Sequence, residues 1–289
     1  MDGLLIIDKP KGCTSRDVVN EIETIYQTKK VGHAGTLDPI ATGVLVVALG
    51  KGLKILEFLN EDTKEYIATV KMGFQTDTLD ITGNIVKEKR DYYLDLNKLS
   101  EVIKSFKGKY LQEVPLYSSV KVNGKRLYKY ARENIEVELP KREVEIFEIE
   151  LLDSNHDEFT FRAVVSKGTY IRSLIRDIGE KIEIFCTMKE LRRTKQGYFS
   201  IEESITLDKL KEKKIKPLPI EKALKDMLVV EVDEKLEFMI SNGRILDNYY
   251  AENKIAFKNK KNEIIAIYKS LDEDFSKIKP IKVFKYNEE

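Results

Sequence analysis

Near the start of the chain, the apolar residues form one short unbroken run and then one helical stripe. Residues 3–7 are an apolar run that ends at Asp8-Lys9-Pro10-Lys11-Gly12, which predicts a buried strand entering a tight turn. Thr14 or Ser15 can then cap a helix. Its apolar positions recur at helical spacing and are Val18, Val19, Ile22, Ile25 and Tyr26. A strand, a turn and a capped helix are therefore predicted in this first segment.

In the next hundred residues the pattern changes at short intervals. Residues 31–43 contain three glycines and one proline, and are predicted to form a loop. The elements expected after it are a buried strand over residues 44–49, a short helix over 53–59, a strand over 66–70 and an amphipathic helix over 97–106. The dipeptide Asn123-Gly124 marks a tight turn.

The following segment combines two alternating strands with one more helix. The strands are expected over residues 144–151 and 159–165, about a turn at Ser154-Asn155, and the helix over 169–182. Strands and helices are thus mixed without a regular β-α-β repeat. This arrangement predicts an α+β fold.

After residues 211–219 the pattern changes again. Short strands between polar turns are expected over residues 229–232, 255–257, 264–268 and 281–286. We therefore predict a domain boundary near residue 227, with a larger domain over residues 1–227 and a small β domain over residues 228–289.

The composition is that of a globular protein. The chain has 289 residues, 42% of them hydrophobic, and 50 Lys and Arg against 49 Asp and Glu give a net charge of +1. The sequence contains no apolar run near the roughly 18 residues that a membrane-spanning helix needs. Met1-Asp2-Gly3 also lacks the basic start of a signal peptide. These features predict a cytoplasmic protein without membrane contact.

The cysteines and histidines exclude several kinds of site. Cys13 and Cys186 lie far apart, and His33 and His156 are the only histidines, so no paired Cys/His zinc pattern can be written. Gly50-Lys51-Gly52 satisfies neither the Walker A nor the G-x-G-x-x-G pattern. We therefore expect no metal and no cofactor.

The net charge hides an uneven distribution. Between residues 104 and 132 there are eight basic residues and one acidic residue, which sum to +7. Residues 133–158 then hold ten acids, and residues 162–195 hold nine basic residues against four acids, a sum of +5. Such clusters are typical of a phosphate-binding face. A solvated surface of alternating charges is the alternative that counting alone leaves open.

Asp38 is the carboxylate best placed for chemistry. It lies in the loop of residues 31–43, where backbone and hydroxyl groups can orient it toward a cleft. Asp-Pro also commonly begins a turn, so residue type alone does not assign it a catalytic role. Enzymes that cleave glycosidic bonds usually need a second carboxyl group. The sequence shows no equally well placed partner for Asp38.

Five ordered motifs resemble one family, the bacterial TruB-type tRNA pseudouridine synthases. They are DKPKGCTS at residues 8–15, GHAGTLDPIATGVL at 32–45, QTDTLD at 75–80, YSSVKVNGKRLY at 117–128 and SKGTYIR at 166–172. The resemblance implies a central mixed, largely antiparallel sheet with flanking helices, a thumb-like insertion over residues 115–141 and a small PUA-like β-barrel over residues 228–289. The sequence departs from the family's usual residues at two places, with Val114-Pro115 in place of Pro-Pro and Ser118-Ser119 in place of Ser-Ala. Both changes are small and leave the expected chemistry unaffected.

The resemblance also implies a reaction, the isomerisation of uridine-55 in the T loop of tRNA to pseudouridine without a cofactor. Asp38 matches the catalytic aspartate, and either a nucleophilic or a glycal-type route is open to it. Tyr66 matches the tyrosine that stacks on the base and is a candidate for the final proton abstraction. Arg172 matches the arginine that pairs with the aspartate. Such a reaction requires a flipped-out nucleotide that is held while its base rotates.

Further positions match substrate-binding or supporting residues of the family. In the pocket region these are Lys9, Pro10, His33, Lys54, Asp80, Tyr170 and Leu191. In the thumb-like insertion they are Lys121, Lys125, Arg126 and Lys129, which would neutralise RNA phosphates. In the last domain Lys254, Lys258, Lys260 and Lys261 are expected to meet the acceptor stem of the tRNA.

Two alternative functions stay open. One is the catalytic subunit of a guide-RNA-dependent pseudouridine synthase. The bacterial-style sequence that continues through Leu49 and the thumb-like insertion argue against this alternative. The other is a tRNA chaperone that refolds the T arm, an activity that can coexist with catalysis. We expect a monomer with no obligate protein partner, since no coiled-coil heptads or large apolar stripe indicate a dimer.

Overall fold

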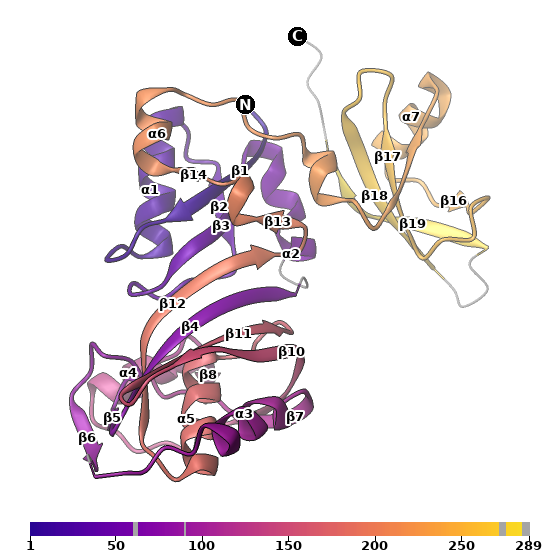
Figure 1. Cartoon of the computed structure of the whole chain (residues 1–289). Helices are drawn as coiled ribbons and strands as arrows, with labels where there is room; N and C mark the ends of the chain where they lie inside the picture. Colours follow the sequence, from indigo (N-terminus) through magenta and orange to yellow (C-terminus); the bar gives the residue numbers. More distant parts are fainter. Residues whose placement is uncertain (60–62, 90, 272–275, 285–289) are drawn as a thin grey trace.

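A computed structural model describes residues 1–59, 63–89, 91–271 and 276–284. Most of its strands form one ten-stranded sheet, drawn along the long axis of Figure 1. In order across the sheet these are β14 (Ile205–Thr206), β1 (Gly3–Lys9), β3 (Thr42–Leu49), β12 (Cys186–Gln196), β4 (Lys64–Met72), β11 (Glu158–Val165), β10 (Lys141–Ser154) and β7 (Gly108–Glu113). Strand β2 (Val31–Ala34) pairs with β3, and β13 (Phe199–Ser200) pairs with β12.

The sheet is mixed and largely antiparallel, as expected. Only the pairs β1–β14 and β3–β12 are parallel among its described strands. The parallel contact of β3 with β12 is short, joining Thr42 to Arg192 and Gly43 to Arg193. Gly43 has φ +100°, and a Cβ at this position would lie 2.2 Å from the carbonyl oxygen of Arg193. Only glycine fits here, because the two backbones approach so closely.

Four helices pack on the sheet around one continuous core. They are α1 (Ser15–Tyr26), α3 (Leu96–Ser105), α5 (Ile171–Ile182) and α6 (Leu207–Glu212). Helix α1 begins at a capping box in which Thr14 and Asp17 bind each other's backbone N–H groups. Its Val18, Val19 and Ile22 are fully buried, which confirms the predicted apolar stripe.

A second, smaller sheet follows the first along the chain. Its order is β15 (Leu228–Glu231), β17 (Lys254–Lys258), β18 (Ile264–Ser270), β19 (Lys277–Val283) and β16 (Leu246–Asp247), with α7 (Glu234–Ser241) beside it. The edge strands β15 and β16 do not pair with each other in the described chain. The domain is therefore a curled half-barrel.

The two sheets share an apolar cluster. Leu4, Ile6, Val44 and Val46 on one face of the large sheet belong to the same buried cluster as Ala256, Ile264 and Ile267 of the small one. Between them lie three short helices, η1 (Gly50–Ile55), α2 (Leu56–Leu59) and η3 (Ile220–Ala223). The boundary near residue 227 stays a prediction.

The remaining short elements lie around the lower half of Figure 1, except for one single-turn helix. Strands β5 (Phe74–Thr76) and β6 (Ile85–Glu88) form one hairpin. Strands β8 (Lys121–Val122) and β9 (Lys125–Arg126) form another about Asn123-Gly124, as expected, and lead into α4 (Leu127–Arg132). The single-turn helix η2 (Ile201–Glu203) follows β13.

The α+β prediction is confirmed, with several differences in the elements. Residues 31–34 form β2 and not a loop, because Val31 and Ala34 are buried against β3. The predicted helix over 53–59 is η1 followed by α2. The last predicted strand corresponds to β19 at Lys277–Val283, while residues 285 and 286 lie outside the described residues.

The longest strand that the sequence did not predict is β12, which lies in the middle of the large sheet. Its sequence, CTMKELRRTKQ, carries too many charged residues to resemble a buried strand. The charges are accommodated by partners on neighbouring strands, as with Arg192, whose guanidinium binds both carboxylate oxygens of Asp8 at 2.9 and 3.1 Å. In the described part of the chain, no helix is long and apolar enough to cross a membrane.

Candidate active site

A pocket of about 390 Å³ brings together residues from five separate segments. The segments are residues 35–38, Lys64 and Tyr66 on β4, residues 117–119 with Tyr128, residues 167–172, and Leu191 with Arg193 on β12. Three of these segments belong to the motifs at residues 32–45, 117–128 and 166–172, and the other two are parts of β4 and β12. The volume falls in the usual range for small-molecule and cofactor sites.

Asp38 and Arg172 form an ion pair in this pocket. Arg172 Nε lies 3.0 Å from Asp38 Oδ2, and Nη2 donates a hydrogen bond to Oδ1 at 3.3 Å. The arginine side chain is 6% exposed and the aspartate side chain 34% exposed. A planar guanidinium that faces both carboxylate oxygens fixes the orientation of the acid.

Arg172 also binds two backbone carbonyls from other segments. Nη1 donates to the Thr78 carbonyl at 2.9 Å and Nη2 to the Tyr117 carbonyl at 3.0 Å. One side chain therefore connects the Asp38 loop, the turn after β5 and the base of the thumb-like insertion. The predicted pairing of Arg172 with Asp38 is present in the geometry.

The Asp38 loop is held by the preceding turn and helix. Ser15 Oγ accepts from the Leu37 N–H at 2.9 Å and donates to the Leu37 carbonyl at 3.2 Å. The N–H of Gly12 donates to the Pro39 carbonyl at 2.8 Å. The first predicted turn therefore has a function that its sequence did not show, which is to support the loop that carries the carboxylate.

Lys9 lies behind this loop, fully buried and outside the pocket lining. Its ammonium donates to the carbonyls of Cys13 at 2.7 Å, Pro10 at 2.9 Å and Pro39 at 3.4 Å. Burial lowers the pKa of Lys9, and the charge of the nearby Asp38 acts in the opposite direction. Pro10 is exposed and contributes its carbonyl to Lys9.

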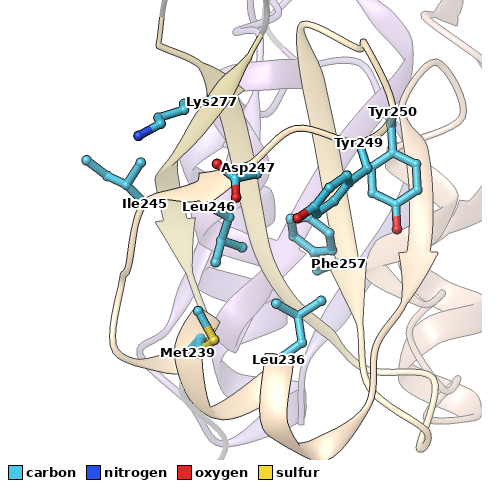
Figure 2. Close-up of a pocket in the computed structure, with 9 residues that line it drawn as sticks. All are labelled: Leu236, Met239, Ile245, Leu246, Asp247, Tyr249, Tyr250, Phe257 and Lys277. Atoms are coloured by element: carbon cyan, nitrogen blue, oxygen red, sulfur yellow. The ribbon is translucent and has the colours of Figure 1, made fainter.

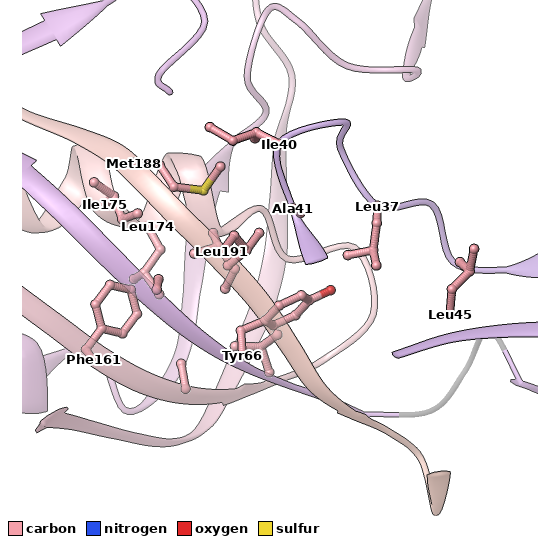
Figure 3. Packing of buried hydrophobic residues seen from close by; sticks show 14 of the residues in the cluster. Leu37, Ile40, Ala41, Leu45, Tyr66, Phe161, Leu174, Ile175, Met188 and Leu191 are labelled. Atoms are coloured by element: carbon pink, nitrogen blue, oxygen red, sulfur yellow. The ribbon is translucent and has the colours of Figure 1, made fainter. Parts of the chain in front are cut away.

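Tyr66 and Leu191 form an apolar wall of the pocket. Tyr66 lies on β4 and Leu191 on β12, and each residue is 7% exposed. Figure 3 shows the tyrosine ring beside Leu191, with its hydroxyl directed toward the side of Leu37. A flat aromatic ring that lines a pocket is the kind of group on which nucleobases stack.

His33 is on β2, where it pairs with Val47, and it does not line the pocket. Its Nδ1 is buried without a hydrogen-bond partner in the described chain. Burial lowers the pKa of His33, and the nearby Arg193 and Arg16 lower it further. The imidazole is therefore neutral near pH 7.

Asp80 and Lys54 lie outside the pocket. Asp80 is buried and accepts hydrogen bonds from Thr78 Oγ1 at 3.0 Å and the Thr82 N–H at 2.9 Å, which shapes the turn that presents the Thr78 carbonyl to Arg172. Lys54 donates to the Val283 carbonyl at 2.5 Å and lies 5.5 Å from the ring of Phe284. Lys54 therefore connects η1 to the second sheet.

Tyr170 lines the pocket at the first residue before α5. Its backbone N–H donates to Gln112 Oε1 at 2.8 Å, and Gln112 Nε2 donates to its carbonyl at 3.1 Å. Gln112 is 1% exposed on β7. This buried amide fixes the start of the helix that carries Arg172, and no motif in the sequence had marked it.

The basic residues of the thumb-like insertion differ in their environments. Lys121, Arg126 and Lys129 are exposed. Lys125 instead pairs with Glu133 and lies 4.8 Å from the ring of Tyr130. Its charge is therefore partly neutralised inside the protein.

Arg193 is the residue that sequence reasoning missed at the pocket. It is fully buried on β12, with Nε donating to the Val44 carbonyl at 2.6 Å and Nη2 to the Gly35 carbonyl at 3.0 Å. It lies in a run of charges that sequence counting assigned to a basic surface, and no signal marked it as buried.

Asp38 is the only carboxylate among the described residues that line this pocket. A pair of carboxyl groups, as most glycoside hydrolases use, is therefore not assembled there. In the described chain, no group of three or more His, Cys, Asp and Glu side chains could hold a metal ion. The groups available for chemistry are therefore one carboxylate with its arginine, the amines of Lys64 and Lys167, and several hydroxyls, among them that of Tyr66.

A second cavity, of about 260 Å³, lies in the small sheet between α7 and β16. Figure 2 shows that mainly apolar and aromatic residues line it, with Asp247 and Lys277 among them. It lacks the arginine-bound carboxylate of the first pocket. The Asp38 pocket is therefore the candidate active site.

Comparisons with known proteins identify the family of the chain. The model of the TruB family pseudouridylate synthase N-terminal domain matches residues 23–171, and that of the tRNA pseudouridylate synthase B C-terminal domain matches residues 172–236. The tRNA pseudouridine synthase B of Clostridium tetani is 43% identical, covering 93% of this chain and 92% of the relative. That of Oceanobacillus iheyensis is 42% identical, covering 98% of each.

Solved structures agree on the fold. A chain in the crystal structure of a Cbf5–Nop10–Gar1 complex is 29% identical with a TM-score of 0.74, covering 98% of this chain and 84% of that chain. A chain in an H/ACA ribonucleoprotein bound to a substrate RNA containing 2′-deoxyuridine is 27% identical with a TM-score of 0.73, covering 98% and 85%.

Proposed function

The chain belongs to the TruB family of pseudouridylate synthases, and from this premise we propose that it isomerises uridine-55 in the T loop of tRNA to pseudouridine. The observation that carries the proposal is the arginine-bound carboxylate of Asp38 beside the ring of Tyr66 in one pocket. The reaction breaks the C–N glycosidic bond and forms a C–C bond to the same base. The base must therefore stay in the pocket between the two steps.

Each pocket residue has a role in this reaction. Asp38 acts on the sugar or the base as a nucleophile, or as the base that removes the C2′ proton of the ribose in a glycal-type route and returns it when the C–C bond forms. Arg172 orients that carboxylate, because its guanidinium contacts both carboxylate oxygens. Tyr66 stacks on the flipped base and Leu191 packs against it. The tyrosine hydroxyl is the candidate that removes the final proton from C5.

RNA binding by the thumb-like insertion is supported by its exposed charges. Lys121, Arg126 and Lys129 project from β8, β9 and α4, next to the segments that supply Tyr117 and Tyr128 to the pocket. In the second sheet, Lys254 lies over the ring of Phe58 and Lys258 pairs with Glu221. Lys260 also pairs with a carboxylate, that of Glu234 at 3.6 Å, so contact with the acceptor stem is expected mainly from the exposed Lys261.

The proposed function is tested by replacing the carboxylate. We expect Asp38→Asn to abolish pseudouridine formation on an unmodified tRNA transcript, because no other carboxylate lines the described pocket. Binding of the transcript should stay within several fold, since the phosphate-binding side chains are unchanged. Turnover is measured by mapping pseudouridine in the transcript, and binding by titration.

The matched control is Asp208→Asn, which removes a carboxylate that is 88% exposed on α6. It should leave turnover and binding unchanged. Near-normal turnover by Asp38→Asn would exclude the assignment. Modification of a uridine other than position 55 would leave the enzyme class intact and correct the substrate site.

The same assay separates the alternative functions. Turnover without a guide RNA excludes a guide-dependent enzyme, and the higher identity to the curated tRNA pseudouridine synthases B than to the Cbf5 chain supports this outcome. A chaperone would increase tRNA folding equally in wild type and in Asp38→Asn. The two activities are therefore measured independently.

A further inference from the structure

Arg193 binds both ends of the loop that carries Asp38. The loop connects β2 to β3, and the two carbonyls that Arg193 binds belong to Gly35 at its start and Val44 just beyond its end. Asp38 lies between them, three residues after Gly35 and six before Val44. The Nε and Nη2 atoms share one edge of the guanidinium plane. The separation of the two carbonyls is therefore set by a rigid group.

The burial of this arginine is costly. Arg193 is fully buried, and no carboxylate forms an ion pair with it in the described chain. Its Nη1 is buried without a hydrogen-bond partner. A buried charge of this kind usually weakens a fold relative to an apolar side chain of the same size. The buried position of Arg193 is therefore better explained by the two carbonyls that it binds than by a contribution to the stability of the fold.

The backbone of the same residue constrains the loop a second time. Gly43 pairs with Arg193 in the short parallel contact of β3 with β12, where the two backbones meet too closely for a Cβ. Gly35, with φ +72°, lies next to the guanidinium, and a Cβ there would be 3.4 Å from Nη1. Both glycines of the loop ends are thus fitted to Arg193.

The other loop contacts act on its middle. Arg172 binds the carboxylate of Asp38, and Lys9 binds the carbonyl of Pro39. Neither of them contacts the loop ends. We propose that Arg193 is a positioning residue, which fixes the two ends of the Asp38 loop so that the carboxylate stands at the right place against the nucleotide. The role in turnover rests on the proposed function, whereas the role in loop rigidity does not.

The test replaces the guanidinium by an ammonium of the same charge. Lysine can bind one carbonyl well but lacks the planar edge that spans two. For Arg193→Lys we expect kcat to fall roughly 10- to 100-fold, because small displacements of a catalytic group cost this much. KM for tRNA should change less than about threefold, since no phosphate-binding group is altered.

A second readout does not depend on activity. Amide hydrogen exchange of residues 35–41 should increase in Arg193→Lys, while exchange in β4 and β11 stays as in wild type. The control is Arg176→Lys, an arginine that is 13% exposed on α5 and binds Glu113 and Asp177. It should change neither kcat nor exchange of the loop.

Several outcomes would overturn the proposal. An Arg193→Lys variant with normal kcat and normal loop exchange would exclude it, as would faster exchange spread over the whole sheet, which indicates a structural role only. If Arg193→Lys does not fold, Gly35→Ala tests the same loop end without changing β12, and normal kcat with normal loop exchange there would also exclude it. If wild type shows no isomerisation of uridine, the exchange result still decides whether Arg193 holds the loop.

Discussion

At the residue scale, the chemistry of the pocket depends on one carboxylate whose loop is bound by three cationic side chains. Arg172 binds the carboxylate itself, Lys9 binds the carbonyl of Pro39, and Arg193 binds the loop ends. Two of these cations are fully buried. Buried charges that bind backbone carbonyls hold a loop in one conformation, because moving the loop would leave the charge without partners.

His33 gives a prediction at this scale. Its folded-state pKa is lowered by burial and by the nearby arginines, whereas in the unfolded chain it protonates near pH 6.5. Below that pH the unfolded state binds more protons, so the free energy of unfolding falls as the pH decreases. The contribution is fully present above about pH 6.5 and is lost as the pH falls toward the lowered pKa.

We therefore expect His33→Asn to reduce the loss of stability between pH 7 and pH 5. The difference in slope reaches at most one proton, or about 1.4 kcal/mol per pH unit. Urea unfolding at a series of pH values measures it. The control is His156→Asn, whose side chain is 78% exposed. Equal slopes for wild type and His33→Asn would contradict the burial of a neutral imidazole.

At the scale of elements, β12 and α5 decide where the active groups lie. Strand β12 carries Leu191 into the pocket wall and Arg193 under the Asp38 loop. Helix α5 carries Arg172, and its start is fixed by the buried amide of Gln112 on β7. The pocket is therefore held by β12 of the central sheet and by the start of α5. Only its thumb side, at Tyr117, Ser119 and Tyr128, comes from an insertion.

The thumb-like insertion gives a prediction at this scale. Replacing Lys121, Arg126 and Lys129 with Ala should weaken tRNA binding and reduce the slope of log K against log salt. Each lost phosphate contact should lower that slope by roughly 0.7 to 0.9. Lys125→Ala should change the slope less, because this side chain pairs with Glu133. Binding titrations between low and moderate salt measure both.

A double variant of exposed lysines outside both basic clusters, Lys98→Ala on α3 with Lys209→Ala on α6, serves as the control for net charge. It should leave the salt dependence unchanged. If it lowers the slope as much as the thumb variant does, the RNA is held by the general charge of the protein and not by the insertion.

At the scale of the whole molecule, the two sheets are joined by one apolar cluster and by polar contacts at its edge. Lys54 donates to the Val283 carbonyl at 2.5 Å, and Lys282 pairs with Glu57 at 3.1 Å. Apolar residues of β17 and β18 share the cluster that covers one face of β1 and β3. The second sheet therefore stabilises the first.

A chain that ends at residue 227 tests this arrangement. All residues that line the Asp38 pocket precede this point, so turnover of an isolated T-arm hairpin should persist. The uncovered apolar surface should lower the melting temperature by several degrees and promote self-association. Thermal unfolding and turnover are measured on the same preparation. A folded truncation without activity, or one with unchanged melting temperature, would contradict the prediction.

Much of the fold and part of the site could be predicted from the sequence. An unbroken apolar run indicated β1, alternating apolar residues indicated β11, and helix-spaced apolar residues indicated α1 and α5. Each pattern reflects which side chains of the element are buried. The ordered motifs indicated Asp38 and Arg172, the resemblance to the family indicated Tyr66, and the structure brings all three to one pocket. Strand β12 could not be predicted, since five of its eleven residues are charged and the one that is buried, Arg193, depends on carbonyl partners from other segments.

The sequence by itself determined the fold class, the resemblance to one family and the identity of the single carboxylate. Only the tertiary structure decided that Arg193 is buried under the Asp38 loop, that Gln112 fixes the start of α5, and that Lys54 faces the second sheet and not the pocket. The physical reason is the range of the interactions. Periodicity and turn residues are local, whereas a charge becomes buried and bound only when strands distant in sequence supply its partners.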